Sequence, residues 1–225
     1  MFPETALVTG SAGGIGRAIV AALEAGGSSV RGLDLIDGFD VSNAEAWDDI
    51  GPTDLVCLNA GVLSSGDGSL ADYRRIVGVN VDGVVFGVQA LAPRMSEGGV
   101  FVVTASLAGL IPMPSDPLYV LTKHAVVGYA RSMAPVLAQR GIRINLICPG
   151  IVRTPMTESA QLELDAAGFP LMRPEQIADA VLLAARSHET GQAWVCQPGR
   201  EPLQFRFPNV PGPRSEGTEG MVPKL

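Results

Sequence analysis

The feature that most constrains the fold is the alternation of short apolar runs with longer segments of helical periodicity. Short runs rich in Val, Ile and Leu predict buried strands, and apolar residues spaced three or four apart predict amphipathic helices. We expect strands at residues 6–8, 29–35, 54–58, 100–104, 142–148 and 193–196, and helices at 15–23, 70–95, 118–139 and 174–187. This order predicts an α/β fold with a doubly wound parallel sheet of about six or seven strands and helices on both faces.

The composition agrees with a buried sheet and excludes several classes of partner. Hydrophobic residues make up 47% of the 225 residues and charged residues 17%, which excludes disorder for most of the chain. The net charge is −7 and Lys and Arg form no cluster, so we expect neither nucleic acid nor a membrane surface as a partner. The longest apolar stretch, residues 76–92, contains Asn80, Asp82 and Gln89 and is too polar to span a membrane.

One change of composition, at Gln197, predicts the domain organisation. Residues 1–197 are expected to form a single domain. Residues 198–225 carry six prolines and no periodic pattern, which predicts a C-terminal extension. The three cysteines, Cys57, Cys148 and Cys196, fall in predicted strands, so we expect buried, reduced thiols in a cytoplasmic protein. The spacing of His, Cys and Asp predicts no metal site.

Residues 9–16, with the sequence Thr-Gly-Ser-Ala-Gly-Gly-Ile-Gly, connect the first predicted strand to the first predicted helix. Glycines permit a tight turn and the close approach of a pyrophosphate, and a helix N-terminus offers free N–H groups. Taken alone, such a turn is equally compatible with an ordinary strand-to-helix connection. The spacing T-G-x-x-x-G-x-G differs from the common G-x-G-x-x-G spacing of dinucleotide-binding proteins, which narrows the comparison.

This loop and five further motifs, in the same order, resemble those of the short-chain dehydrogenase/reductase family. The resemblance covers roughly residues 4 to 197 and implies a single-domain, Rossmann-type oxidoreductase with a nicotinamide cofactor. The matching motifs are Asn59-Ala60-Gly61, Asn80 within the long predicted helix, Ser106 in the context Ser-x-Ala-Gly, Tyr119 with Lys123, and residues 149–154 as P-G-x-V-x-T.

The proposed catalytic pair, Tyr119 and Lys123, lies four residues apart and therefore on one face of a helix. An ammonium group beside a phenol lowers its pKa, so we expect Lys123 to make Tyr119 a usable base for the proton of an alcohol while hydride leaves the carbinol carbon. Ser106 would hold the same substrate oxygen. The resemblance assigns Asn80 to a water that relays the proton. Each residue alone has a simpler structural interpretation, and the hypothesis depends on their occurring together.

Asp34, at the end of the second predicted strand, indicates the cofactor. A carboxylate there accepts hydrogen bonds from the ribose hydroxyls and repels a 2′-phosphate, which favours NAD over NADP. The motifs together predict cofactor contacts from Gly10, Ser11, Gly14, Ile15, Gly16, Asp34, Asp40, Val41, Asn59, Ala60, Gly61, Tyr119, Lys123, Pro149, Gly150, Val152 and Thr154.

The region after Asp34 departs from the family pattern. Asp40 and Val41 resemble the family's Asp-Val pair beside the adenine, but they follow Asp34 by only six residues. A parallel crossover needs at least about 10–12 residues, so we expect the usual helix to be missing and the third strand to be absent, displaced or very short. The roles of Asp40 and Val41 at the adenine stay open.

The candidate substrate residues are apolar apart from the serine and favour an apolar secondary alcohol or ketone: Ser106, Leu107, Met113, Ile151 and Met156. Two other functions stay open, the same chemistry with NADP and a non-catalytic NAD-binding regulator. The combination of Ser106, Tyr119, Lys123 and Asn80 argues against the regulator, which has no need of a proton acceptor.

Self-association is expected as a homotetramer or homodimer, because the two long helices are apolar around more of their circumference than one sheet can cover. The residues that we expect to need a second partner are Val84, Val85, Phe86, Val88, Leu91, Val126, Val127, Tyr129, Met133 and Val136. In the extension, the alternation of Leu203, Phe205 and Phe207 favours one buried edge, packed across the body of the protein or a neighbouring subunit; a loose terminus is an equally open alternative.

Overall fold

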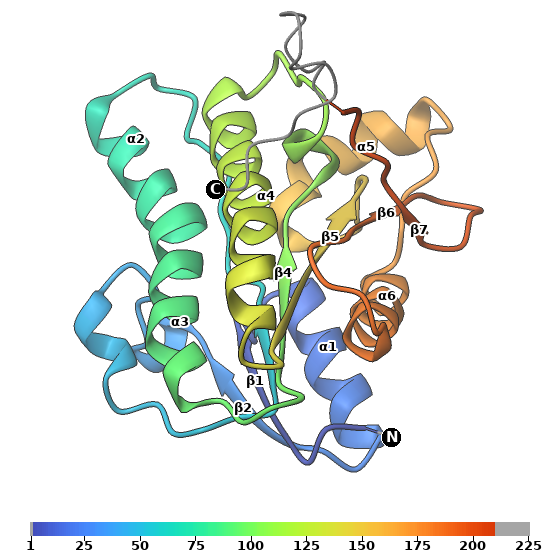
Figure 1. Cartoon of the computed structure of the whole chain (residues 1–225). Helices are drawn as coiled ribbons and strands as arrows, with labels where there is room; N and C mark the ends of the chain where they lie inside the picture. The colour runs from blue at the N-terminus through green and yellow to red at the C-terminus, as the bar shows by residue number, and fades with distance from the viewer. Residues whose placement is uncertain (1, 210–225) are drawn as a thin grey trace, which may run out of the picture.

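A computed structural model describes residues 2–209 and shows a seven-stranded sheet in the order β2-β1-β3-β4-β5-β6-β7 (Figure 1). Strands β1 to β6 pair in parallel and β7 pairs antiparallel to β6. The predicted doubly wound parallel sheet is confirmed. The strands are β1 Thr5–Thr9, β2 Ser29–Leu33, β3 Leu55–Leu58, β4 Val100–Thr104, β5 Arg143–Pro149, β6 Ala193–Cys196 and β7 Leu203–Gln204.

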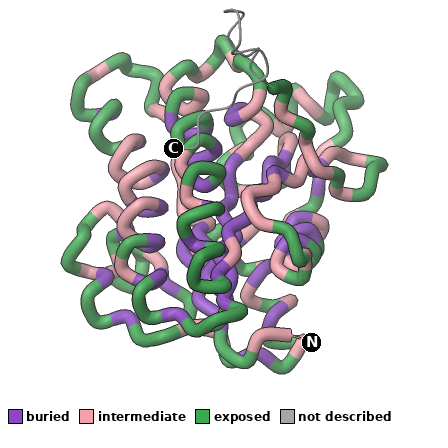
Figure 2. Tube along the Cα trace, viewed as in Figure 1, coloured by how far each residue is buried: buried purple, intermediate pink, exposed green. Residues whose placement is uncertain are grey.

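Helices cover both faces of the sheet, α3 and α4 on one and α1 and α6 on the other (Figure 1). Each face has its own hydrophobic cluster, because the strands between the two layers are buried on both sides. Figure 2 shows the buried residues gathered in the strands and on the inward sides of these helices. The helices are α1 Gly14–Ala25, α2 Leu70–Val77, α3 Gly83–Leu91, α4 Pro117–Ala138, α5 Glu158–Ala166 and α6 Pro174–Arg186.

The long helix expected at residues 70–95 is divided in the structure. A π-helical segment, Gly78–Asp82, separates α2 from α3, and a 3₁₀ turn, Ala92–Arg94, ends the run. Short π-helical segments occur often at functional sites, and this one contains Asn80. The whole run, Leu70–Arg94, is long enough to span a membrane and contains an apolar stretch with a mean hydropathy of 1.5. Half of that stretch is buried within this fold.

The connection from β2 to β3 is short, as the sequence predicted. Within the described residues it contains two 3₁₀ turns, Leu35–Asp37 and Ala44–Trp47, and no strand, so β2 is the edge of the sheet. The Trp47 side chain is fully buried, donates from Nε1 to the Val41 carbonyl at 3.1 Å and meets the Phe39 ring edge-on at 5.1 Å. The indole therefore packs between the short connection and α3, on the α3–α4 face of the sheet.

The predicted C-terminal extension adds a strand to the sheet, which the sequence pattern did not indicate. Strand β7 lies within it, and Phe205 and Phe207 pack against the α3–α4 cluster, whereas Leu203 is 45% exposed. The Arg131 guanidinium on α4 stacks 3.6 Å from the centroid of the Phe207 ring. The last residues of the extension, 210–225, lie outside the described part of the chain.

The apolar faces of the two long helices are narrower than the sequence indicated. Val84, Val88, Leu91, Val126 and Val127 belong to the core of the single chain and need no second partner. Their burial against the sheet corrects that part of the expectation. An outer group stays partly or largely accessible: Val85, Phe86, Tyr129, Met133 and Val136.

Replacing Trp47 with Ala should destabilise the fold by about 3–5 kcal/mol, because the indole is fully buried and the short β2–β3 connection has little else to fill the cavity. Urea unfolding would measure this loss. Leu162→Ala is the matched control, since Leu162 is 82% exposed and its truncation should change the free energy of unfolding by less than about 0.5 kcal/mol. A Trp47→Ala loss below about 1 kcal/mol would show that the indole does not support the connection.

Candidate active site

A chain of hydrogen bonds crosses the carboxyl ends of β1, β3 and β4. The Thr9 hydroxyl accepts from the backbone N–H groups of Asn59 and Ala60 at 3.0 and 3.1 Å. The Asn59 amide donates to the Thr9 carbonyl and accepts from the Thr104 hydroxyl, both at 3.1 Å. Lys123 Nζ then donates to the Thr104 carbonyl at 3.0 Å. The glycine-rich loop and the lysine of α4 are therefore held in one frame.

The glycine-rich loop has the backbone that its sequence predicts. Gly10 has φ +66°, a conformation that favours glycine, and its N–H donates to the Leu33 carbonyl at 2.9 Å. A Cβ on Gly16 would lie 2.0 Å from the Gly10 carbonyl oxygen, so only glycine fits there. Helix α1 begins at Gly14 with no side-chain cap and no acidic residue in its first turn. Its N-terminal N–H groups and partial positive charge suit a phosphate.

The loop after β5 lies against the same helix start. A Cβ on Gly14 would lie 2.8 Å from Thr154 Cγ2, which places residues 149–154 beside the glycine-rich loop. Val152 is buried and forms an isolated parallel bridge with Met172. Gly150 donates from its N–H to the Cys196 carbonyl at 2.9 Å, which fixes this loop to the end of β6.

Asp34 stands at the edge of the glycine-rich loop. Its Oδ2 accepts from the Ala12 N–H at 2.9 Å and its Oδ1 from the Ile36 N–H at 3.2 Å. The carboxylate is thus oriented by backbone donors on both sides, next to the turn that would carry the pyrophosphate.

Asp40 and Val41 both make contacts within the protein, but of different kinds. Asp40 is exposed and accepts from the N–H and hydroxyl of Ser42 at 2.9 and 2.7 Å. Val41 is buried at 7% exposure, and a Cβ on Gly83 would lie 2.8 Å from its Cγ2. Its side chain therefore packs against the start of α3.

The candidate catalytic residues meet at the N-terminal part of α4. Lys123 Nζ lies 5.5 Å from the centroid of the Tyr119 ring. Ser106 caps the 3₁₀ turn Leu107–Gly109, its hydroxyl accepting from the Ala108 N–H at 3.1 Å, and its side chain lies near enough to the Tyr119 phenol to lower the pKa of that phenol. A Cβ on Gly61 would lie 3.3 Å from both Lys123 Nζ and Asn80 Oδ1, so glycine keeps this approach open.

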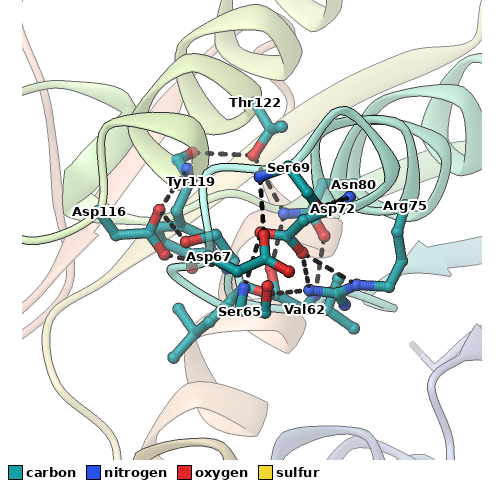
Figure 3. A network of polar contacts seen from close by, with 12 residues as sticks. Val62, Ser65, Asp67, Ser69, Asp72, Arg75, Asn80, Asp116, Tyr119 and Thr122 are labelled. Atoms are coloured by element: carbon teal, nitrogen blue, oxygen red, sulfur yellow. Dashed lines mark hydrogen bonds and ion pairs between the residues drawn. The ribbon is translucent and has the colours of Figure 1, made fainter.

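Asn80 is almost fully buried and holds the loop after β3. Its Oδ1 accepts from the Val62 N–H at 2.8 Å, and its Nδ2 donates to the Val62 carbonyl at 2.9 Å and to the Thr122 hydroxyl at 3.0 Å. Thr122 in turn donates to the Tyr119 carbonyl at 2.8 Å. Both amide donors of Asn80 are thus engaged, and the side chain ties the π-helical segment to α4 (Figure 3).

The electrostatics of the Tyr119–Lys123 pair differ from the expectation. Burial raises the pKa of Tyr119 to about 12; the hydrogen bond with Ser106 lowers this pKa and the charge of Asp116 raises it. Burial lowers the pKa of Lys123 to about 8. Loss of solvation disfavours the charged form of each group and outweighs the attraction between ammonium and phenolate.

The apolar candidates for substrate contact come from three segments of the chain. Leu107 directly follows Ser106, Met113 lies in the segment that leads to α4, and Ile151 follows β5; all three are half-buried. Met156 is 42% exposed in a 3₁₀ turn, Pro155–Thr157, that precedes α5. Helix α5 has no buried residue and is tied back by an ion pair of Arg153 with Asp165 at 2.7 Å.

The residues present fit a dinucleotide with a nicotinamide end. These features lie together at the carboxyl ends of the strands. They are the uncapped start of α1, the glycine contacts that leave no room for a Cβ, the carboxylate of Asp34 and the buried ammonium of Lys123. Sequence reasoning missed Thr104 and Thr122, which carry no pattern of their own, and it included Thr9 only as the first residue of the glycine-rich motif. It also missed Asp116 as the cap of α4, although Asp before Pro117 is a recognisable helix-start signal.

Comparisons with known proteins agree with this geometry. The family model described as enoyl-(acyl carrier protein) reductase matches residues 38–199. The rat 15-hydroxyprostaglandin dehydrogenase [NAD(+)] is 31% identical and the bovine enzyme 34% identical over 197 residues, which cover 71% of this chain and 72% of each relative. The oxidoreductase UcpA of Salmonella typhimurium is 31% identical, covering 69% of this chain and 72% of that protein.

Among solved structures, ligand-free aldohexose dehydrogenase from Thermoplasma acidophilum superposes with a TM-score of 0.78 at 25% identity, covering 86% of this chain and 92% of that one. The structure of gox2181 superposes with a TM-score of 0.75 at 27% identity. Together with the glycine-rich loop and the cluster of Ser106, Tyr119 and Lys123, these matches show that the chain is an oxidoreductase enzyme that belongs to the short-chain dehydrogenase/reductase family.

Proposed function

We propose that this enzyme is an NAD-dependent oxidoreductase that interconverts an apolar secondary alcohol and its ketone. The observation that carries the proposal is the meeting of Ser106, Tyr119 and Lys123 beside a loop built for a pyrophosphate. The bound nicotinamide would accept or supply the hydride.

The chain's own residues would hold the substrate oxygen and move its proton. The Ser106 hydroxyl lies near the Tyr119 phenol and lowers its pKa, so a substrate oxygen bound here would contact both groups. In oxidation Tyr119 takes the proton from the alcohol, and in reduction it returns the proton to the ketone. One N–H of Lys123 is fixed by the Thr104 carbonyl, so its remaining N–H donors stay available near the phenol for a bound cofactor.

The substrate class is proposed from the side chains around this position. Leu107, Met113, Ile151 and Met156 offer apolar surface. Such a lining suits an apolar alcohol better than a sugar or an acid. The names of the mammalian relatives describe a hydroxyprostaglandin and NAD, which supports an alcohol as the reacting group and NAD as the cofactor.

Replacing Tyr119 with Phe should lower turnover by at least about 10²-fold, the usual contribution of a general base, while NADH binding is kept. The assay follows NADH absorbance over a panel of secondary alcohols, with titration calorimetry for binding. Tyr129→Phe is the matched control, because Tyr129 lies on the same helix and its hydroxyl has no hydrogen-bond partner among the described residues. Wild-type turnover by the Tyr119→Phe enzyme would contradict the proposed mechanism.

The preference for NAD is proposed from Asp34. A 2′-phosphate at the ribose would place a second anion beside this carboxylate, and like charges in a partly buried site lower affinity by about tenfold or more. Replacing Asp34 with Ser should weaken the binding of NAD and remove the repulsion that NADP meets. Both effects lower the ratio of kcat/KM with NAD to kcat/KM with NADP.

Kinetics with each cofactor measures this ratio, and Asp37→Ser, an exposed carboxylate three residues further along, is the control. An unchanged ratio in the Asp34→Ser enzyme would mean that Asp34 does not contact the ribose and that the short β2–β3 connection has rebuilt this pocket.

Self-association is proposed through the outer faces of α3 and α4, on the support of Phe86, Tyr129, Met133 and Val136. Val136 is 53% exposed in the single chain, so Val136→Asp should leave the fold intact and shift the protein from dimer or tetramer towards monomer. Light scattering at micromolar concentration measures the mass, with Leu162→Asp as a control on another exposed site. A monomeric wild-type protein would refute this surface.

A further inference from the structure

Asp116 holds two distant segments together at the start of α4. It is the N-cap of the helix, and its Oδ1 accepts from the Tyr119 N–H at 2.9 Å. Ser64 binds the same carboxylate twice, its N–H donating to Oδ2 at 3.0 Å and its hydroxyl to Oδ1 at 2.8 Å. We propose that Asp116 is a positioning residue for the proposed base: it fixes Tyr119 to the loop of residues 62–69 and holds a carboxylate without an ion-pair partner at the N-cap, three residues before Tyr119.

The loop of residues 62–69 makes this contact rigid, because it is anchored on both sides of Ser64. Asn80 holds Val62 through both its N–H and its carbonyl. Asp72 on α2 accepts from the Ser65 N–H at 2.8 Å. Figure 3 shows these anchors around one loop, with Asp116 reaching it from the α4 side. A shift of the loop would therefore move the first turn of α4, and with it the phenol.

The negative charge of Asp116 has no basic partner. Within residues 2–209 its carboxylate makes no ion pair, whereas Asp72 pairs with Arg75 at 2.6 Å. In the loop, Asp67 is turned to the Ser69 N–H, which donates to it at 2.8 Å. The other titratable groups near this end of α4, on that helix and on the elements packed against it, are Lys123, His124, Cys148 on β5, Asp82 in the π-helical segment, and Asp72, Tyr73, Arg74 and Arg75 on α2.

Among these groups Asp116 is the carboxylate that acts on Tyr119, and its charge raises the pKa of the phenol. Cys148, whose pKa burial raises to about 12, stays a neutral thiol at neutral pH. A raised pKa keeps the phenol protonated at neutral pH, ready to donate to a ketone, and makes alcohol oxidation depend on alkaline pH. The inference rests on the proposed role of Tyr119 as the general acid and base.

The test is the pH dependence of kcat/KM for alcohol oxidation with saturating NAD. This rate rises as the pH passes the pKa of the base, and we call this rising part of the pH profile the acidic limb. Removing the nearby negative charge should lower the pKa of the base and so move the acidic limb to lower pH. We expect Asp116→Asn to shift the limb down by about 0.5–1 pH unit, less than for a fully buried pair because Asp116 is half-exposed. Its Oδ1 can still cap the Tyr119 N–H.

Three variants separate charge from packing. Asp116→Glu keeps the charge and should keep the wild-type limb. Ser64→Ala removes one hydrogen bond but leaves the charge, so it should lower thermal stability without moving the limb downwards. Asp67→Asn removes a negative charge from the same loop without touching α4 and should leave the limb in place. If Asp116→Asn does not fold, Asp116→Ser retains a capping oxygen and carries the same expectation.

A limb in Asp116→Asn that superposes on the wild type, or an equal shift in Asp67→Asn, would overturn the proposal. Tyr119→Phe in the same assay separates this failure from that of the proposed function. If Tyr119→Phe keeps wild-type turnover, the proposed base is wrong; if it is inactive and the Asp116→Asn limb does not move, only the role of Asp116 is wrong.

Discussion

The hydrogen bonds around Asn59 are the interaction on which the site depends. One side chain joins the ends of three strands, and its neighbours extend the contact to the glycine-rich loop on one side and to Lys123 on the other. Without these hydrogen bonds the parallel strands would end in unpaired polar groups. Unpaired polar groups are costly to bury. The position of α4 relative to the glycine-rich loop thus follows from backbone and amide hydrogen bonds at the carboxyl ends of the strands.

The short β2–β3 connection shows how the fold tolerates the loss of a strand and a helix. The Trp47 indole covers the sheet on its α3–α4 face, and its approach to α3 requires Gly87, where a Cβ would lie 2.9 Å from the ring. Arg94 then caps the carbonyls of Trp47 and Ile50 at 3.0 and 2.7 Å. The connection also contacts both ends of the π-helical segment that holds Asn80, through Ser42 beside Gly78 and Val41 beside Gly83.

Much of this could be predicted from the sequence, for identifiable reasons. Buried strands and amphipathic helices leave strong periodic signals, and the missing crossover followed from chain length between Asp34 and Asp40. Strand β7 could not be predicted, because it has two residues and pairs only through tertiary contact. The π-helical segment around Asn80 leaves no pattern distinct from a helix. The burial of Val84 and Val88 also needed the structure, since a helix that is apolar all round does not show which side faces the sheet.

The sign of the Tyr119 pKa shift shows what a motif alone leaves out. The spacing of Tyr119 and Lys123 correctly places an ammonium 5.5 Å from the phenol ring, and from that distance a lowered pKa is the natural expectation. Burial of both groups acts on each in the opposite sense, towards the neutral phenol and the neutral amine. A buried pair of this kind responds strongly to any added charge, because low polarity enlarges Coulomb interactions. An oxidised nicotinamide, being positive, would lower the pKa of the phenol and would so favour the form of Tyr119 that the proposed mechanism needs to take a proton.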